Sequence, residues 1–383
     1  MSPTQFESFP LYAMQTILIA AVVYLLVWRQ PLILRLQVLG WAAGVLAIAW
    51  RYGANAQLGF YSNDQLQYAS IVRILVSETW PRTLQWWFEF SKIPYPMAAY
   101  PLALIGIHGA LALKTVSLVC LLALSRAVID RHAGPGLMSQ TKVLYLTGCG
   151  LIGSFFSLLA LRETMMMYFV YRYTTDKSLS GRLMSFGIIF LLRSHLAAAL
   201  IAAELALATW RWLTERRRLG FAEVPALIVG GVTLGTILFS IRFVGFDDIR
   251  TPFTGNFGRK DVIQIASNFA GLQFMTIQDA FTKLSVSELL LLRVVFSDTV
   301  LIPLAFTVVC FVFGNRLSER HRFTLLTFCA YVSIVTNTDF NSFRQNIPLM
   351  PLLGLVILDL MSEPRRRAGI DHRRENAPAI LVT

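Results

Sequence analysis

Apolar segments, each separated from the next by a short polar stretch, dominate the pattern along this chain. A helix that crosses a bilayer needs about 20 predominantly apolar residues. By this measure the pattern predicts eleven helices, several of them short, at 11–28, 36–50, 109–129, 143–160, 164–176, 183–195, 196–212, 223–242, 297–314, 324–337 and 347–361. The predicted fold class is therefore an all-α polytopic membrane protein.

Two of the short predicted helices carry polar groups. The segment 164–176 contains Arg172, and 183–195 contains Arg193 and His195. Ionisable side chains are costly inside a bilayer, and broken helices are tolerated there only where protein or water covers them. We expect these two segments to be half-helices or to line a polar cavity.

Composition agrees with this class, because 55% of the residues are hydrophobic, 15% are charged and the mean hydropathy is +0.58. Soluble proteins average about 25% charged residues. We expect a single transmembrane domain over 1–364, with inserts at 51–108 and 243–297, and a basic, disordered tail at 365–383. The first helix lacks the basic start of a cleavable signal peptide, so we expect it to be retained.

Lysine and arginine placement predicts the orientation of the helices. These residues crowd the short loops on one side, which the positive-inside rule makes cytoplasmic. An odd helix count then places the N-terminus outside and the C-terminus in the cytoplasm. Both long inserts fall on the outer side, where the working parts of a membrane-embedded bundle are expected.

The first outer insert is rich in aromatic residues, and its first half has a helical pattern. Tyr68, Ile71, Val72 and Leu75 recur at helical spacing, which predicts a helix on the membrane surface. Asp64 lies off this apolar stripe, at the position expected to cap the helix N-terminus.

Two interpretations of this insert remain open. Trp and Tyr gather at the headgroup level in most membrane proteins, so the insert fits an interfacial aromatic belt with a helix cap. It also fits a site for carbohydrate and polyprenyl lipid, because aromatic faces stack on sugar rings and a carboxylate such as Asp64 can deprotonate an acceptor hydroxyl. The aromatic candidates for such a site are Tyr68, Trp86, Trp87 and Tyr95.

The order of these segments resembles the GT-C membrane glycosyltransferases. Asp64 is followed by Tyr68 and Ala69, and the Tyr95-Pro96 pair then leads through a second surface helix into the next spanning helix. The resemblance covers roughly 60–213. It implies that the chain transfers sugar from a polyprenyl-phosphate donor at the outer face of a bacterial inner membrane, with Asp64 as the catalytic base.

A second part of the resemblance concerns two charged pairs. Arg162-Glu163 opens one apolar stretch, and Arg193 with His195 follows about thirty residues later. This spacing is similar to that of GT-C enzymes and of exopolysaccharide and O-antigen polymerases, and it implies that Arg193 and His195 bind the donor phosphate. The alternative is a structural salt bridge between the two hairpins.

The outer face carries more cations than that side should. They include Arg250, Arg259 and Arg344. A lipid-linked phosphate or pyrophosphate would be bound by charge-assisted hydrogen bonds from such arginines. Attraction to anionic headgroups is an alternative for any one of them.

The sequence offers little support for a metal site or a nucleotide-binding site. The chain departs from many GT-C members because no second acidic residue follows Asp64 closely, and Asp247-Asp248 is not a DxD metal motif. The four cysteines lie in apolar runs without metal-binding spacing, and no nucleotide-binding motif is present. We therefore expect no metal, no cofactor and no nucleic-acid partner.

The sequence thus predicts a glycosyltransferase that joins a polyprenyl-linked sugar to a glycan or lipid-linked acceptor during cell-envelope synthesis. Two alternatives stay open. A polymerase that joins lipid-linked repeat units would use the same geometry on larger substrates. A transporter of lipid-linked saccharides is the second, although transporters tend to carry internal repeats and the two halves of this chain show no clear repeat.

Overall fold

The computed structural model describes residues 3–52, 62–77, 94–132, 140–142, 154, 157–216, 318–338 and 347–360. Within these ranges the chain is helical apart from turns and contains no strand, which confirms the all-α prediction. The predicted helices at 223–242 and 297–314, nearly all of 143–160, the second insert and the tail lie outside the described residues. The count of eleven helices therefore stays a prediction.

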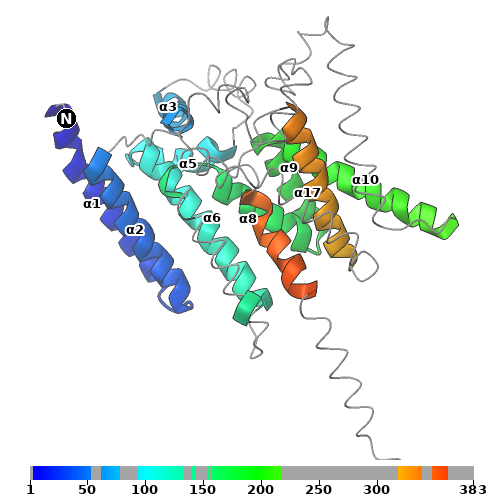
Figure 1. Cartoon of the computed structure of the whole chain (residues 1–383). Helices are drawn as coiled ribbons and strands as arrows, with labels where there is room; N and C mark the ends of the chain where they lie inside the picture. The colour runs from blue at the N-terminus through cyan, green and yellow to red at the C-terminus, as the bar shows by residue number, and fades with distance from the viewer. Residues whose placement is uncertain are drawn as a thin grey trace, which may run out of the picture.

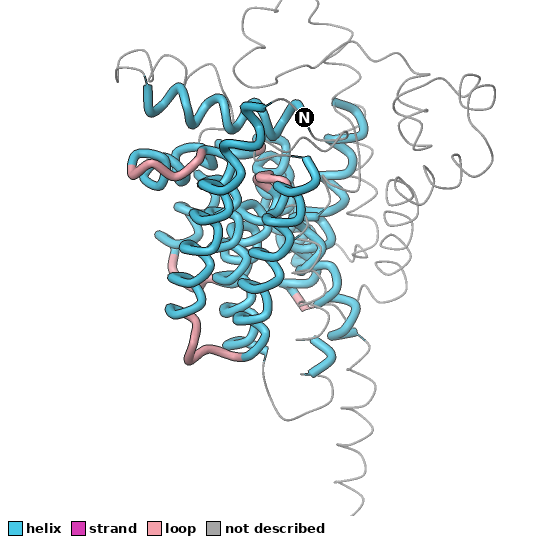
Figure 2. The backbone as a smooth tube through the Cα atoms, turned by 90° about the vertical axis from the view of Figure 1, so that its left-hand side faces the viewer, coloured by secondary structure: helices cyan, strands magenta, loops and turns pink. Residues whose placement is uncertain are grey.

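The first three long helices, α1 (Pro3–Leu26), α2 (Leu32–Tyr52) and α6 (Gly109–His132), run side by side in both views (Figures 1 and 2). Each contains a segment long and apolar enough to cross a membrane. Leucines and other large apolar side chains of α1, such as Leu18 and Leu25, face outward. An apolar exterior on apolar helices of this length is the pattern of a membrane protein.

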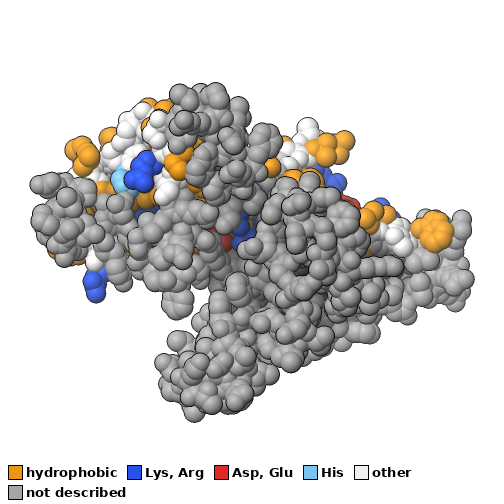
Figure 3. Space-filling view, turned by 90° about the horizontal axis from the view of Figure 1, so that it is seen from above, with side chains coloured by type: hydrophobic (Ala, Val, Ile, Leu, Met, Phe, Trp, Pro, Cys, Tyr) orange, Lys and Arg blue, Asp and Glu red, His pale blue; other side chains and the backbone are white. Residues whose placement is uncertain are grey.

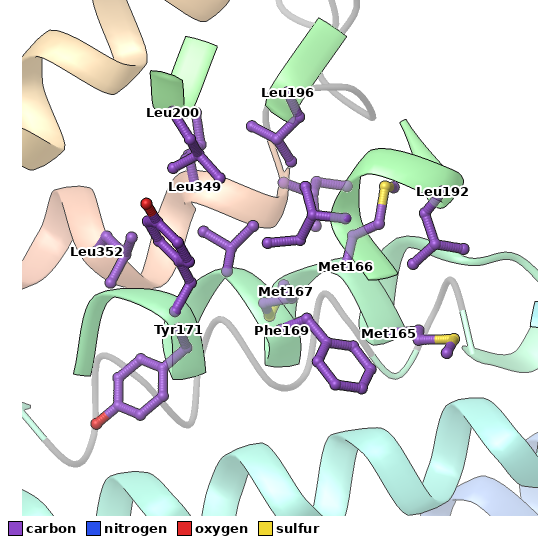
Figure 4. Packing of buried hydrophobic residues seen from close by; sticks show 14 of the residues in the cluster. Met165, Met166, Met167, Phe169, Tyr171, Leu192, Leu196, Leu200, Leu349 and Leu352 are labelled. Carbon is purple, nitrogen blue, oxygen red and sulfur yellow. The ribbon is translucent and has the colours of Figure 1, made fainter. Parts of the chain in front are cut away.

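A larger core lies around α8 (Glu163–Thr175), which contacts α6 on one side and α9 (Leu179–Leu192) on another. Most of α8 is buried, because its apolar residues are distributed around the whole helix. Met166 of α8 lies beside Leu192 of α9, and Met167, Tyr171 and Leu352 belong to the same buried cluster (Figure 4). The core is completed by α10 (Ser194–Arg216), α17 (Glu319–Thr338) and the helical stretch Ile347–Leu360.

The short helices predicted at 164–176 and 183–195 are present as α8 and α9, and whether they are half-helices or line a polar cavity stays a prediction. At about 1.5 Å per residue, α8 and α9 extend only about 20 Å. The predicted helix at 183–195 was wrong at both ends, because α9 begins at Leu179 and ends at Leu192. Arg193 has extended backbone angles (φ −158°, ψ 95°), and α10 begins directly after it.

Two helices lie at the end of the bundle where α6 begins, which we call the α3 end (Figure 1). These are α3 (Ser62–Ser77) and α5 (Pro94–Leu104). The buried face of α3 consists of Tyr68, Val72 and Leu75, as the apolar stripe predicted. A Cβ atom added at Gly109 of α6 would lie 3.5 Å from Val72 Cγ1, so α3 packs closely on the start of α6. The end where α6 finishes is called the opposite end.

Candidate functional site

Three of the predicted site residues meet in the interior near the α3 end. Arg193 Nη2 lies 3.8 Å from Glu163 Oε1, and Arg193 Nη1 donates to Tyr331 Oη at 2.9 Å. The side chain of Glu163 has no exposed surface and that of Arg193 has 9%. Arg162, also buried, donates from Nη1 to the carbonyl oxygen of Leu192. We call Arg162, Glu163 and Arg193 the arginine cluster.

Helix ends place these side chains together. Helix α8 begins at Glu163 and α10 begins at Ser194, so the N-termini of both helices lie at the arginine cluster. The first N–H groups of a helix lack intrahelical acceptors and carry partial positive charge. The guanidinium groups of Arg162 and Arg193 and the carboxylate of Glu163 thus lie beside two helix N-termini.

The turn that precedes α8 is strained. Ala160 has φ of 52°, a left-handed backbone conformation that is uncommon for residues other than glycine. Its N–H donates to the Ser157 carbonyl at 3.2 Å. After this turn the carbonyl group of Leu161 accepts a hydrogen bond from α6, and Arg162 directly precedes the first residue of α8. Backbone strain of this kind persists where surrounding contacts hold it.

A chain of polar contacts links the surface helices to that turn. The ring of Tyr68 in α3 packs edge-to-face on the ring of Tyr95 in α5, with centroids 5.4 Å apart. Tyr95 Oη lies 2.7 Å from Ser117 Oγ, which in turn donates to the Leu161 carbonyl at 3.1 Å. Burial raises the pKa of Tyr95 well above its ordinary value, so its hydroxyl stays protonated. These contacts connect helices α3 and α5 to Leu161, the residue that precedes Arg162.

Asp64 lies in the first turn of α3, the helix that it was predicted to cap, because this helix begins at Ser62. The face of α3 on which its side chain lies stays a prediction. The structure describes only the backbone at this position. A carboxylate in the first turn is favoured by the helix dipole.

The remaining predicted residues divide into two sets. His195 is half-buried in the first turn of α10, two residues after Arg193. The others lie outside the described residues, and their roles stay predictions: Trp86, Trp87, Arg250, Arg259 and Arg344. Among the residues that the structure describes, no group of three His, Cys, Asp or Glu side chains is placed to hold a metal ion.

Sequence analysis missed two members of the site, Tyr331 and Ser117. Both lie in apolar helices and are fully buried, and each makes one of the hydrogen bonds described above. A single hydroxyl in an apolar run is ordinary, so neither carried a signal that could have selected it. The sequence allowed only the general expectation that a hydroxyl group buried in an apolar helix has a hydrogen-bond partner.

Seen from the α3 end, acidic and basic side chains lie next to each other near the middle of the molecule (Figure 3). A separate cavity of about 360 Å³ lies against α2, and its lining is mostly apolar: Ile33, Leu36, Gln37, Gly40, Trp41, Ser154 and Leu158. It does not touch the arginine cluster.

Comparisons of the chain with protein-family models, with curated proteins and with solved structures return no match. The chemistry of the site is therefore the basis on which a function is assigned.

Proposed function

We propose that this chain is a membrane glycosyltransferase that moves a sugar from a polyprenyl-phosphate or -pyrophosphate donor to an acceptor hydroxyl. The observation that carries the proposal is the buried arginine cluster at the converging N-termini of α8 and α10. It is linked to α3, the helix whose first turn contains Asp64, by the contacts of Tyr68, Tyr95 and Ser117. An anion site and a candidate base are thus combined at one end of the bundle.

The arginine cluster suits the departing phosphate. Guanidinium groups make charge-assisted and often bidentate hydrogen bonds to phosphate oxygens. Glu163 and Tyr331 hold Arg193 in one orientation, so its charge is in place before the reaction begins. Preorganised charge of this kind stabilises a transition state without reorganisation. His195, in the first turn of α10, is the second donor that we assign to the phosphate.

Asp64 suits the acceptor. In the proposed step its carboxylate takes the proton of the acceptor hydroxyl while the hydroxyl oxygen attacks the anomeric carbon of the sugar. The bond between that carbon and the phosphate oxygen breaks, and its electron pair stays on the lipid phosphate beside the arginines. The polyprenyl phosphate leaves as an anion and needs little help from an acid.

The contact between Glu163 and Arg193 also fits the structural alternative, a salt bridge that only joins two hairpins. A purely structural ion pair does not need a second buried guanidinium beside it. Arg162 brings that second positive charge into the same buried region. Two buried guanidinium groups beside two helix N-termini support the choice of an anionic ligand.

The test is to incubate the purified full chain with a panel of polyprenyl-linked sugars and to measure release of the lipid phosphate. We expect Asp64→Asn to abolish transfer and to keep the unfolding temperature of the wild-type chain, because the amide is nearly the same size but cannot accept the proton. The matched control is Asp130→Asn, which removes an exposed carboxylate at the opposite end of α6.

Full activity of Asp64→Asn on a donor that the wild-type chain uses would remove Asp64 from the mechanism. Loss of activity in both variants would point to a general effect of charge. Absence of lipid phosphate release from every donor, by a chain that is folded, would overturn the proposed function itself.

A further inference from the structure

A second charged cluster lies at the opposite end of the bundle, far along the helices from the arginine cluster. The last turn of α6 ends in Arg131 and His132, and the first turn of α17 contains Arg320 and His321. Asp359 accepts from Lys142 and lies 2.8 Å from His321 Nε2. Four separate segments therefore bring charged groups to one place.

Asp359 is the carboxylate at the centre of this cluster, but it is already occupied by Lys142 and His321. Arg131 donates to the carbonyl oxygen of Thr175 at 3.0 Å and forms no ion pair in the part of the chain that the structure describes. Arg320 likewise has no described ion pair, and its buried Nη2 atom has no hydrogen-bond partner among the described residues. Neither guanidinium group therefore has an ion pair among the described residues, although the Asp359 carboxylate lies near enough to Arg320 to oppose the lowering of its pKa.

These two arginines lie close enough to repel each other. Burial and then the charge of Arg131 lower the pKa of Arg320. Tyr171 Oη and His132 Nε2 lie 3.3 Å apart beside them. An anion placed here would remove the repulsion and satisfy the buried Nη2 atom at the same time.

We propose that Arg131 and Arg320, with Tyr171 and His132, form a binding site for a phosphate group at the end of the bundle opposite α3. A phosphate monoester suits the site better than a carboxylate, because it offers three acceptor oxygens and a charge of about −1.5 to −2 to two arginines and a hydroxyl. The end of the candidate span at His132 is the level of lipid headgroups, so the phosphate can come from an anionic lipid or from solution. The site does not depend on the proposed sugar transfer.

Crowding of basic residues on one face of a membrane protein is common, so the site must be distinguished from diffuse attraction. Arg126 provides the comparison. It lies on the same end of α6, but it is about half exposed and pairs with Asp130 at 2.8 Å. Diffuse attraction to an anionic surface would use Arg126 as well as Arg131 or Arg320, whereas a built site would use only the latter two.

The experiment measures thermal unfolding of the full chain in detergent micelles against increasing short-chain phosphatidic acid, with phosphatidylcholine as the uncharged reference. A parallel titration uses inorganic phosphate against sodium chloride of equal ionic strength. We expect a saturable rise in unfolding temperature with one of the two phosphate sources. Arg320→Gln and Arg131→Gln should each weaken apparent affinity about tenfold, because each removes a charge-assisted hydrogen bond.

Arg126→Gln, which removes the same charge from the same end, should change the affinity by less than about twofold. A response to phosphatidic acid alone assigns the site to a lipid, and a response to inorganic phosphate alone assigns it to a soluble ligand. Equal weakening in Arg126→Gln and in the two site variants would overturn the proposal, as would the absence of saturable stabilisation by either source. If Arg320→Gln does not fold, Arg131→Gln provides the same comparison.

Discussion

Lys114 is a charged residue in a fully buried position. It lies inside the apolar helix α6 with no exposed surface, and its ammonium group donates to one neutral acceptor, Tyr12 Oη, at 3.2 Å. Within the described residues no carboxylate forms an ion pair with it. Burying an ammonium group without a counter-charge opposes folding.

We therefore expect Lys114→Met to stabilise the chain, by on the order of 1 kcal/mol or more, because methionine fills a similar volume without the desolvation penalty. The measurement is the unfolding transition in detergent micelles. Lys142→Met is the contrasting control, since it removes a lysine that pairs with Asp359 and should destabilise. Destabilisation by Lys114→Met would show that the charge of Lys114 has a partner or a role of its own.

At the scale of single residues, the sequence predicted the charged members of the candidate site better than the neutral ones. Arg162, Glu163 and Arg193 could be grouped because ionisable side chains in apolar segments must find partners. Tyr331 has no such signal, although it accepts a hydrogen bond from Arg193.

At the scale of elements, the turn between α8 and α9 depends on close packing at Gly181. Ser178 caps α9 by accepting from the Gly181 N–H at 3.1 Å, and the Asp176 carboxylate accepts from the Ser178 N–H at 2.9 Å. A Cβ atom at position 181 would overlap Asp176 and lie 2.7 Å from Ser178 Oγ. The cap exists only because this position has no side chain.

Gly181→Ala should therefore destabilise the chain, by about 1–3 kcal/mol in unfolding free energy, because the capping turn must shift to make room. Gly187→Ala in the same helix meets nothing within 4 Å and should stabilise by about 0.5–1 kcal/mol through helix propensity. Thermal unfolding of the two variants side by side provides the measurement. Effects of the same sign would contradict the proposed importance of the cap.

Helices were predictable from hydrophobic length, and their junctions were not. The prediction of 164–176 agrees with α8 to within one residue at each end, since its flanks are polar. The break between α9 and α10 falls at Arg193, close to the junction predicted between 195 and 196, but the extended conformation of Arg193 leaves no trace in a pattern of apolar residues. The left-handed turn at Ala160 was equally hidden, because alanine carries no turn signal.

At the scale of the whole molecule, the two charged clusters lie at opposite ends of helices that include candidate membrane spans. The arginine cluster is near the α3 end, and the cluster around Asp359 is at the end where α6 finishes. Helix α8 connects the two over about 20 Å, because Glu163 begins it and its Tyr171 and Thr175 contact His132 and Arg131. The compartment that each cluster faces determines which substrates it can bind.

The basic loops predict that the α3 end is extracytoplasmic, and cysteine labelling in intact cells can test this. In a background without native cysteines, a membrane-impermeant maleimide should label Ser77→Cys, which is exposed on α3, but not Lys177→Cys, which is exposed in the turn after α8. A permeant maleimide should label both, which controls for accessibility. The reverse pattern would turn Asp64 toward the cytoplasm. It would remove the extracytoplasmic donor from the proposed reaction and would leave the phosphate site at the opposite end facing outward.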